Sequence, residues 1–276
     1  MRQKVEAYIL RGLTWLGSIF TMAVLGCVVG YILIKGIPHL RPELFSWKYS
    51  SENVSMLPAL INTLLMTAVA LVLAVPLGIG AAIWLTEYAR RGNRLVKLVR
   101  ITAETLSGIP SIIYGLFGAL CFVEAMKLGL SLLSGALTLA IMILPLIMRT
   151  TEEALLAVPD SFREGSFGLG AGRLRTTFKV VLPSAIPGIL AGVILAVGRI
   201  VGETAALIYT AGTVPEVAKS LTSSVRTLSV HMYLISNEGL YVSQSYATAV
   251  VLLVIVMGIN FLSEWIARKV SSHGRV

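Results

Sequence analysis

The stretch LPALINTLLMTAVALVLAVPLGIGAAIWL, residues 57–85, contains no charged side chain. A bilayer hydrocarbon core of about 30 Å requires roughly 20 apolar residues in a helix, so this stretch is long enough to cross it. Five further apolar stretches occur, at residues 13–34, 106–126, 132–148, 185–211 and 247–266. The sequence therefore predicts an all-α membrane protein with six transmembrane helices, of which 132–148 is the shortest.

Composition supports this class. The 276 residues are 56% hydrophobic and 13% charged, with a mean hydropathy of +0.83, whereas soluble domains carry about 25% charged residues. The net charge of +9 does not indicate nucleic-acid binding, because the Lys and Arg residues form short clusters between apolar stretches. Cys27 and Cys121 lie inside apolar stretches, and the sequence shows no Cys/His pattern of a metal site.

The distribution of basic residues predicts the orientation. If the spans alternate, 16 Lys and Arg residues fall on the side of the two termini and 6 fall on the opposite side. Because cytoplasmic loops are enriched in Lys and Arg, both termini are expected in the cytoplasm.

The fifth stretch contains two charges, in the run Ile194-Leu-Ala-Val-Gly-Arg-Ile-Val-Gly-Glu-Thr204. Arg199 and Glu203 are four residues apart and so would share one helical face. Small or polar residues continue that face, which is therefore expected to point into the protein: Gly192, Ala196, Ala206 and Thr210. The pair could be a structural ion pair. We favour a pathway in which Arg199 stabilises an anion and Glu203 holds its guanidinium, because charges inside membranes usually mark transport routes.

A polar segment follows the fourth stretch. Ser161 and Glu164 have the spacing of a capping box, and Gly168, Gly170 and Gly172 follow soon after, which predicts a short helix on a cytoplasmic loop. The glycines do not form a nucleotide-binding loop, because no strand precedes them and no Gly-Lys-Ser/Thr occurs in the chain.

This segment resembles the signature loop of ABC importer permeases. Glu164-Gly-Ser, Gly170 and Val180-Val-Leu-Pro183 keep that loop's spacing, with Gly165, Ser166 and Val180 as departures. The resemblance implies the type I ABC importer permease fold, with a short cytoplasmic coupling helix that docks on a separate ATPase subunit. The residues implied in this coupling, with the two phenylalanines and the leucine as apolar contacts, are Ser161, Phe162, Glu164, Phe167, Leu169 and Gly170.

Other segments narrow the resemblance to the permeases of bacterial phosphate importers, closest to the PstA-type subunit. They include Asn62-Thr-Leu-Leu65, Glu104-Thr-Leu-Ser-Gly-Ile-Pro110, Val158-Pro-Asp-Ser-Phe-Arg-Glu164 and Gly198-Arg-Ile-Val-Gly-Glu-Thr204. The resemblance implies a homologous PstC-type permease as heterodimer partner, an ABC ATPase dimer and a periplasmic phosphate-binding protein, in the bacterial inner membrane. ATP and Mg would bind the ATPase, and this chain would bind no cofactor.

The same resemblance matches Arg199 and Glu203 to transport-essential charges. The adjacent Thr204 is expected to donate a hydrogen bond. Ser107 and Ser111 flank the Gly108-Ile-Pro110 break, where they would either line the pathway or cap the helix.

Two units are expected, residues 1–56 with the first helix and an external loop, and residues 57–276 with the permease domain. Three alternatives to phosphate import stay open: a permease for another oxyanion or small nutrient, a secondary transporter that needs no ATPase, and a structural scaffold. An enzyme is not expected, because no nucleophile–base set is visible.

Overall fold

The computed structural model describes residues 2–90 and 92–273, and the side-chain environments of residues 10–90, 92–262 and 265. Every regular element in these ranges is a helix. The longer helices are α1 (Arg2–Gly36), α2 (Leu57–Ile83), α3 (Arg94–Ser107), α5 (Leu132–Leu156), α8 (Leu182–Gly202), α10 (Leu228–Asn237) and α11 (Val242–His273). The shorter α-helices are α4 (Ser111–Gly118), α6 (Asp160–Gly168), α7 (Arg173–Thr176) and α9 (Ala205–Thr210). Two 3-10 turns follow α1, and π-helical turns follow α2 (Trp84–Tyr88) and α4 (Ala119–Ala125) and precede α8 (Thr177–Val181).

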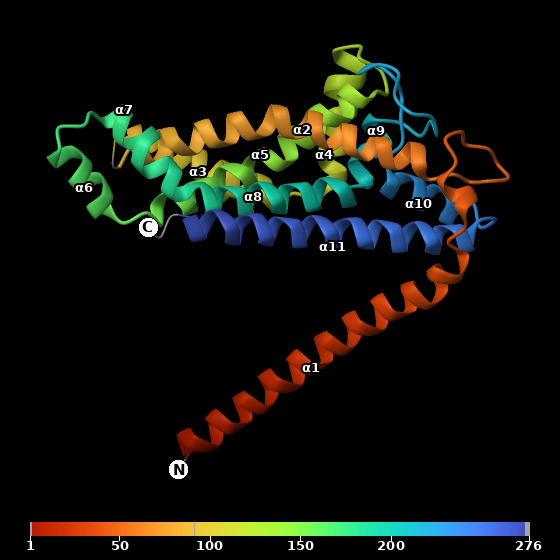
Figure 1. The fold of residues 1–276 in the computed structure, drawn as a ribbon, viewed down its shortest axis with the longest axis horizontal. Coiled ribbons are helices and arrows are strands. Elements are labelled where there is room, and N and C mark those ends of the chain that lie inside the picture. The colour runs from red at the N-terminus through yellow and green to blue at the C-terminus, as the bar shows by residue number, and fades with distance from the viewer. Residues whose placement is uncertain (1, 91, 274–276) are drawn as a thin grey trace.

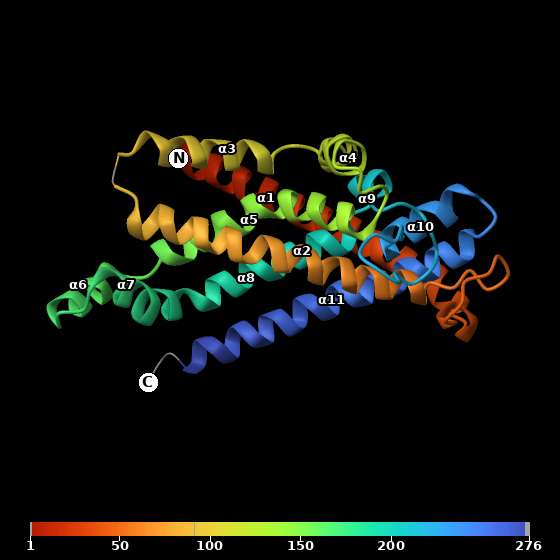
Figure 2. The same cartoon turned by 90° about the horizontal axis from the view of Figure 1, so that it is seen from above.

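Five helical segments are long and apolar enough to cross a membrane: Leu10–His39, Leu57–Tyr88, Leu132–Leu156, Arg173–Gly202 and Val242–Leu262. A sixth crossing is made only if Arg94–Ser107 and Ser111–Ala125 count as one, although they are bent by 102°. Figure 2 shows α4 end-on, across the direction of the main helices. The bend lies at the Gly108-Ile-Pro110 break that the sequence predicted at the start of the span 106–126. Pro110 explains the break, because proline lacks the N–H and disfavours helical conformation in the preceding residue.

The fourth predicted span is longer than expected and occupies the centre. Helix α5 continues eight residues past 148 to Leu156, and two thirds of its apolar part is buried, against one third or less for the other four spans. Small residues allow this close packing. A Cβ at Gly192 of α8 would collide with the Thr150 side chain, and one at Gly78 of α2 would press on Ile147.

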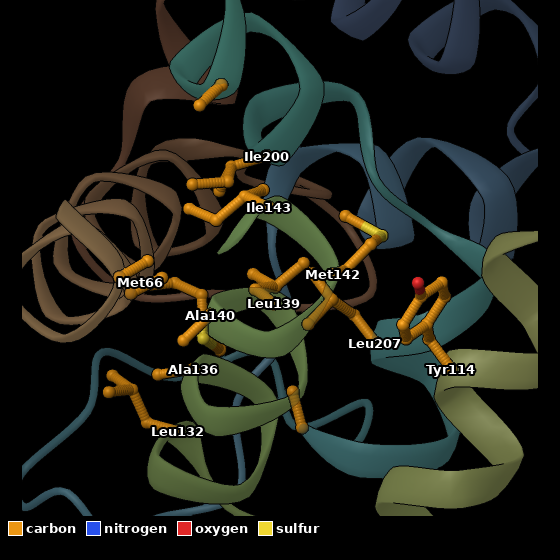
Figure 3. Packing of buried hydrophobic residues seen from close by; sticks show 14 of the residues in the cluster. Met66, Tyr114, Leu132, Ala136, Leu139, Ala140, Met142, Ile143, Ile200 and Leu207 are labelled. Carbon is orange, nitrogen blue, oxygen red and sulfur yellow. The ribbon is translucent and has the colours of Figure 1, made fainter. Parts of the chain in front are cut away.

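The core surrounds α5, against which α2, α4, α8 and α9 pack (Figure 3). Leu139 and Ile143 of α5 are fully buried and belong to one cluster with Met66, Ile200 and Leu207. Large apolar side chains elsewhere are exposed along the outer faces, as expected for helices that face lipid.

The long helices lie side by side and define two ends of the molecule (Figure 1). Helices α6 and α7 and the end of α11 lie at one end, called the α6 end. Helix α10 and the loops 37–56 and 212–227 lie at the other, called the α10 end. Helix α1 diverges from the bundle and meets α11 only near its own end, where the Tyr31 and Tyr246 rings lie 5.8 Å apart.

Candidate functional site

The fifth span is broken at Glu203, whereas Arg199 lies in the last turn of α8. Helix α8 ends at Gly202, Glu203 is extended with φ −73° and ψ 127°, and α9 begins at Ala205. The prediction of one continuous helix with Arg199 and Glu203 on a shared face is therefore wrong. The predicted inward orientation is confirmed for the small residues of that stripe, which are all buried: Gly192, Ala196, Ala206 and Thr210.

Glu203 stabilises the break with its side chain and with its backbone carbonyl. Its Oε1 accepts a hydrogen bond from the Ala206 N–H at 3.1 Å, one of the donors left unpaired in the first turn of α9. Its carbonyl accepts a hydrogen bond from the Ser229 hydroxyl of α10 at 2.6 Å. No ion pair between Glu203 and Arg199 occurs in the described structure.

Arg199 is half-buried near the end of α8 and forms no ion pair within the described part of the chain. Tyr114 of α4 lies within reach of its charge. A half-buried guanidinium without a carboxylate partner keeps its donors available for an anion.

Thr204 borders a cavity of about 600 Å³ between α4, α9, α10, α11 and the end of α1. Its hydroxyl lies 3.5 Å from the Gly202 carbonyl, at the limit of a hydrogen bond. Helix α4 approaches α9 closely here, because a Cβ on Gly115 would collide with the backbone of Ala206.

The structure separates the two serines at the Gly108–Pro110 break. The Ser107 hydroxyl donates to the Ala103 and Glu104 carbonyls at 2.9 Å, so it is used inside its own helix. Ser111 is half-buried in the first turn of α4, and no hydrogen bond of its hydroxyl occurs among the described residues. Tyr114 bridges the break by donating to the Leu106 carbonyl at 2.8 Å.

The short polar helix is present as α6. It begins at Asp160 behind Pro159 and has no side-chain cap, so the predicted capping box with Ser161 at its start is wrong. Its end follows the glycine prediction: Gly170 has φ +80° and donates to Phe167, while Ala171 donates to Ser166. These two bonds form a Schellman motif, for which glycine is favoured at the left-handed position.

Helix α6 presents apolar side chains outward at the end of the molecule. Phe162 and Phe167 are about half exposed and Leu169 is 91% exposed. Ser161, Phe162 and Leu169 border a shallow hollow of about 460 Å³, and the Glu164 side chain is exposed beside it. Exposed apolar groups on a polar helix are typical of a docking surface.

Arg163 of α6, which the sequence analysis did not single out, joins this surface to the bundle. Its Nη2 donates to Glu87 at 2.7 Å and to the Leu155 carbonyl at 2.9 Å, and its Nη1 donates to the Val158 carbonyl at 2.8 Å. Glu87 lies in the π-helical turn after α2, and Leu155 lies in the last turn of α5. The hydrogen bonds to Glu87 raise the pKa of Arg163 above its usual value. The only sequence signal for this contact was Glu87, an acidic residue just after the apolar stretch 57–85.

Comparison with known proteins identifies relatives. A family model described as binding-protein-dependent transport system inner membrane component matches residues 74–272. The chain is 31% identical to the probable ABC transporter permease protein YqgI of Bacillus subtilis, with 98% of both chains aligned. It is 36% identical to the phosphate transport system permease protein PstA of Pasteurella multocida, over 76% of this chain and 75% of that protein. It is 32% identical to the PstC permease of Mesorhizobium japonicum, over 83% and 78%.

Two solved structures share the architecture. The MetNI methionine ABC transporter, in an inward-facing conformation, superposes with a TM-score of 0.62 at 23% identity, over 77% of this chain and 93% of that chain. A bacterial alginate ABC transporter superposes with a TM-score of 0.61 at 18% identity, over 95% and 94%. At these identities the likeness concerns the fold, and the predicted type I ABC importer permease fold is confirmed.

Proposed function

The chain belongs to the family of binding-protein-dependent transport system inner membrane components, and from this membership we propose that it carries inorganic phosphate into the cytoplasm as the permease subunit of an ATP-driven importer. The observation that carries the choice of substrate is the alignment with phosphate permeases over about three quarters of this chain or more. As a permease of this family, the chain is a transport subunit and not an enzyme.

Arg199 is the residue proposed to face phosphate during transport. An isolated dianion is strongly disfavoured in a low-dielectric interior, and a guanidinium that is not neutralised by a carboxylate lowers that barrier. The site should bind weakly, because conduction requires release as well as entry. Thr204 and Ser111 are proposed to contribute hydroxyl groups, whereas Ser107 caps its own helix.

The assembly is proposed to contain a homologous PstC-type permease, a dimer of ABC ATPases and a periplasmic phosphate-binding protein. ATP and Mg would bind the ATPases, and no cofactor is assigned to this chain. The exposed apolar side chains of α6 support an ATPase contact at the α6 end. The protein spans the membrane several times. We place both termini in the cytoplasm of a bacterial inner membrane because of the distribution of basic residues.

Uptake of labelled phosphate by the reconstituted complex tests this function. Phosphate-loaded binding protein should stimulate ATP hydrolysis, and Arg199→Gln should lower uptake by about 10- to 100-fold, the value of charged hydrogen bonds worth about 1.5–3 kcal/mol. Lys127→Gln, which removes an exposed cation, is the control and should leave uptake unchanged.

Other substrates are outcomes of the same experiment, because proteins with this fold are named for methionine and alginate transport. Stimulation by sulfate or an organic nutrient, but not by phosphate, would keep the importer and change its substrate. Uptake without any ATPase would instead indicate a secondary transporter.

A further inference from the structure

A second polar cluster lies at the α10 end, in α10 and the segment before it. At its centre lie Arg226, in the segment before α10, and His231, on α10. The exposed fraction is 5% for Arg226 and 0% for His231. Nε and Nη2 of Arg226 and both ring nitrogens of His231 have no hydrogen-bond partner among the described residues. The Val54 backbone approaches the His231 ring without reaching hydrogen-bond geometry. Because buried polar atoms are almost always paired, these four nitrogens indicate a partner from outside the chain.

Tyr49 covers this pair. Its ring lies 4.4 Å from the Arg226 guanidinium carbon in a cation–π contact, and its centroid is 6.2 Å from that of the His231 ring, edge to face. Tyr49 also borders a cavity of about 510 Å³ together with Trp47, Lys48, Glu216 and Lys219. A movement of one side chain would therefore connect the buried pair with an open cavity.

The charges around this cluster favour an anion. Lys48 and Lys219 are at the cavity, and Glu216 lies 3.5 Å from Lys219, which leaves Lys48 and Arg226 as positive charges without an acidic partner among the described ion pairs. Glu238 is the acidic residue whose charge reaches Arg226, but the two form no ion pair in the described structure.

The backbone beside the pair is strained. Val54 is fully buried and has φ +44°, in the left-handed region that β-branched residues rarely occupy. Such strain persists only where the surroundings fix it, and it is concentrated at binding and switch regions. The strained backbone at Val54 therefore agrees with a preformed binding site beside the Arg226–His231 pair.

The two side chains together define the hydrogen-bonding pattern of the ligand. Burial, followed by the charge of Arg226, lowers the pKa of His231 to about 3, so the imidazole is neutral at physiological pH. A neutral imidazole has one donor and one acceptor nitrogen, whereas a guanidinium only donates. The matching ligand therefore accepts hydrogen bonds and also donates one. Hydrogenphosphate does both, whereas sulfate only accepts.

We propose that Arg226 and His231 form a binding site for a protonated oxyanion at the external mouth of the permease, covered in this structure by Tyr49, and that it selects hydrogenphosphate over sulfate. The Arg226 fork receives the anion oxygens, and the acceptor nitrogen of His231 receives the P–OH proton as a hydrogen bond. This site rests on the proposed function and adds a selective step before Arg199.

Equilibrium binding of labelled inorganic phosphate to the assembled permease–ATPase complex in nanodiscs, without the periplasmic protein, tests the site. We expect saturable binding that sulfate does not displace. Arg226→Gln should weaken it about tenfold or more, since it removes charged donors. His231→Phe keeps a ring but removes the acceptor, and it should weaken phosphate while bringing sulfate to within about tenfold of it. Tyr49→Ala should speed association.

Two controls keep the result interpretable. Arg41→Gln removes an exposed arginine on the same side and should leave binding unchanged. Binding should also persist in Arg199→Gln, because Arg199 is not among the residues that border the cavity beside Tyr49. If Arg226→Gln does not assemble, Arg226→Lys keeps the charge, loses the fork and should still weaken binding.

Binding that is absent up to several millimolar, insensitive to Arg226 variants or equal for phosphate and sulfate would overturn the proposed site. These failures are distinct from failure of the proposed function, which would appear as no phosphate uptake by the wild-type complex even with its binding protein.

Discussion

Glu203 stabilises the break in the fifth span through two different groups. Its carboxylate pairs with the Ala206 N–H in α9, and its carbonyl pairs with Ser229, which lies 26 residues later in α10. The side chain is buried, so the hydrogen bond it supplies is not readily replaced by water. These contacts separate two roles that the sequence alone could not distinguish, helix capping and charge compensation for Arg199.

Substitutions at Glu203 should distinguish these two roles. Glu203→Gln keeps a carbonyl oxygen for Ala206 and should leave thermal stability and phosphate uptake close to wild type. Glu203→Ala removes the acceptor and should cost about 1 kcal/mol, the usual value of a lost helix cap. Thermal unfolding of the purified complex and uptake in proteoliposomes measure both effects. A Gln variant with normal stability but no uptake would instead assign the negative charge to transport.

The sequence singled out Arg199 and Glu203 as candidate site residues, but it did not predict their geometry. An apolar stretch that contains Arg199 and Glu203 is visible in one dimension, because charges are costly in a membrane. The change of backbone conformation at Glu203 depends on Ser229, which no local pattern connects to it. The Arg226–His231 cluster was missed for the same reason, since its Tyr49 contact comes from a loop far away in the sequence.

At the scale of elements, the local signals that succeeded are the backbone ones. Pro110 marks the break between α3 and α4, and Gly170 marks the end of α6. Helix starts and lengths were less reliable: α6 begins one residue before Ser161, and α5 extends beyond its apolar stretch to Leu156. The last turns of α5 carry polar residues because they pack at the α6 end and not against lipid.

The contact of α6 with the bundle depends on Arg163, which joins Glu87 to the end of α5. Glu87→Gln should remove the buried carboxylate partner of Arg163 and leave only the exposed Asp160, 3.2 Å from Nη1. The cost should therefore stay below about 3 kcal/mol, the value for a buried charge left without any partner. We expect more ATP hydrolysed per phosphate transported, because the ion pair that ties α6 to the end of α2 would be lost, while the bond from Arg163 to Leu155 of α5 remains. The measurement is the ratio of ATP hydrolysis to uptake in the same proteoliposomes.

A matched control and a second variant test this interpretation. Glu153→Gln breaks the exposed pair with Arg149 and should change the ratio little, as exposed pairs contribute about 0–1 kcal/mol. The exchange Glu87→Arg with Arg163→Glu should rescue only partly, because a glutamate cannot donate to the Leu155 and Val158 carbonyls. Full rescue, or an unchanged ratio in Glu87→Gln, would contradict the coupling role.

At the scale of the whole molecule, α5 physically connects the two ends. Leu155 in its last turn accepts a hydrogen bond from Arg163 of α6, whereas the Leu132 and Leu133 amides in its first turn donate to Ser223 and Leu221 of the loop at the α10 end. Between these contacts the helix is the most buried of the long apolar spans. A displacement of α6 therefore has a direct route to the segment that carries Arg226.

This arrangement makes a prediction about which end meets the ATPase. Leu169 is 91% exposed at the α6 end, and Leu240 is 80% exposed at the α10 end, so the two leucines form a matched pair. Leu169→Asp should abolish co-purification of the ATPase subunit, because a charge placed in an apolar contact is left unpaired on docking. Leu240→Asp should leave the ATPase bound. If only Leu240→Asp releases the ATPase, the orientation is reversed, and the Arg226–His231 site would then face the cytoplasm.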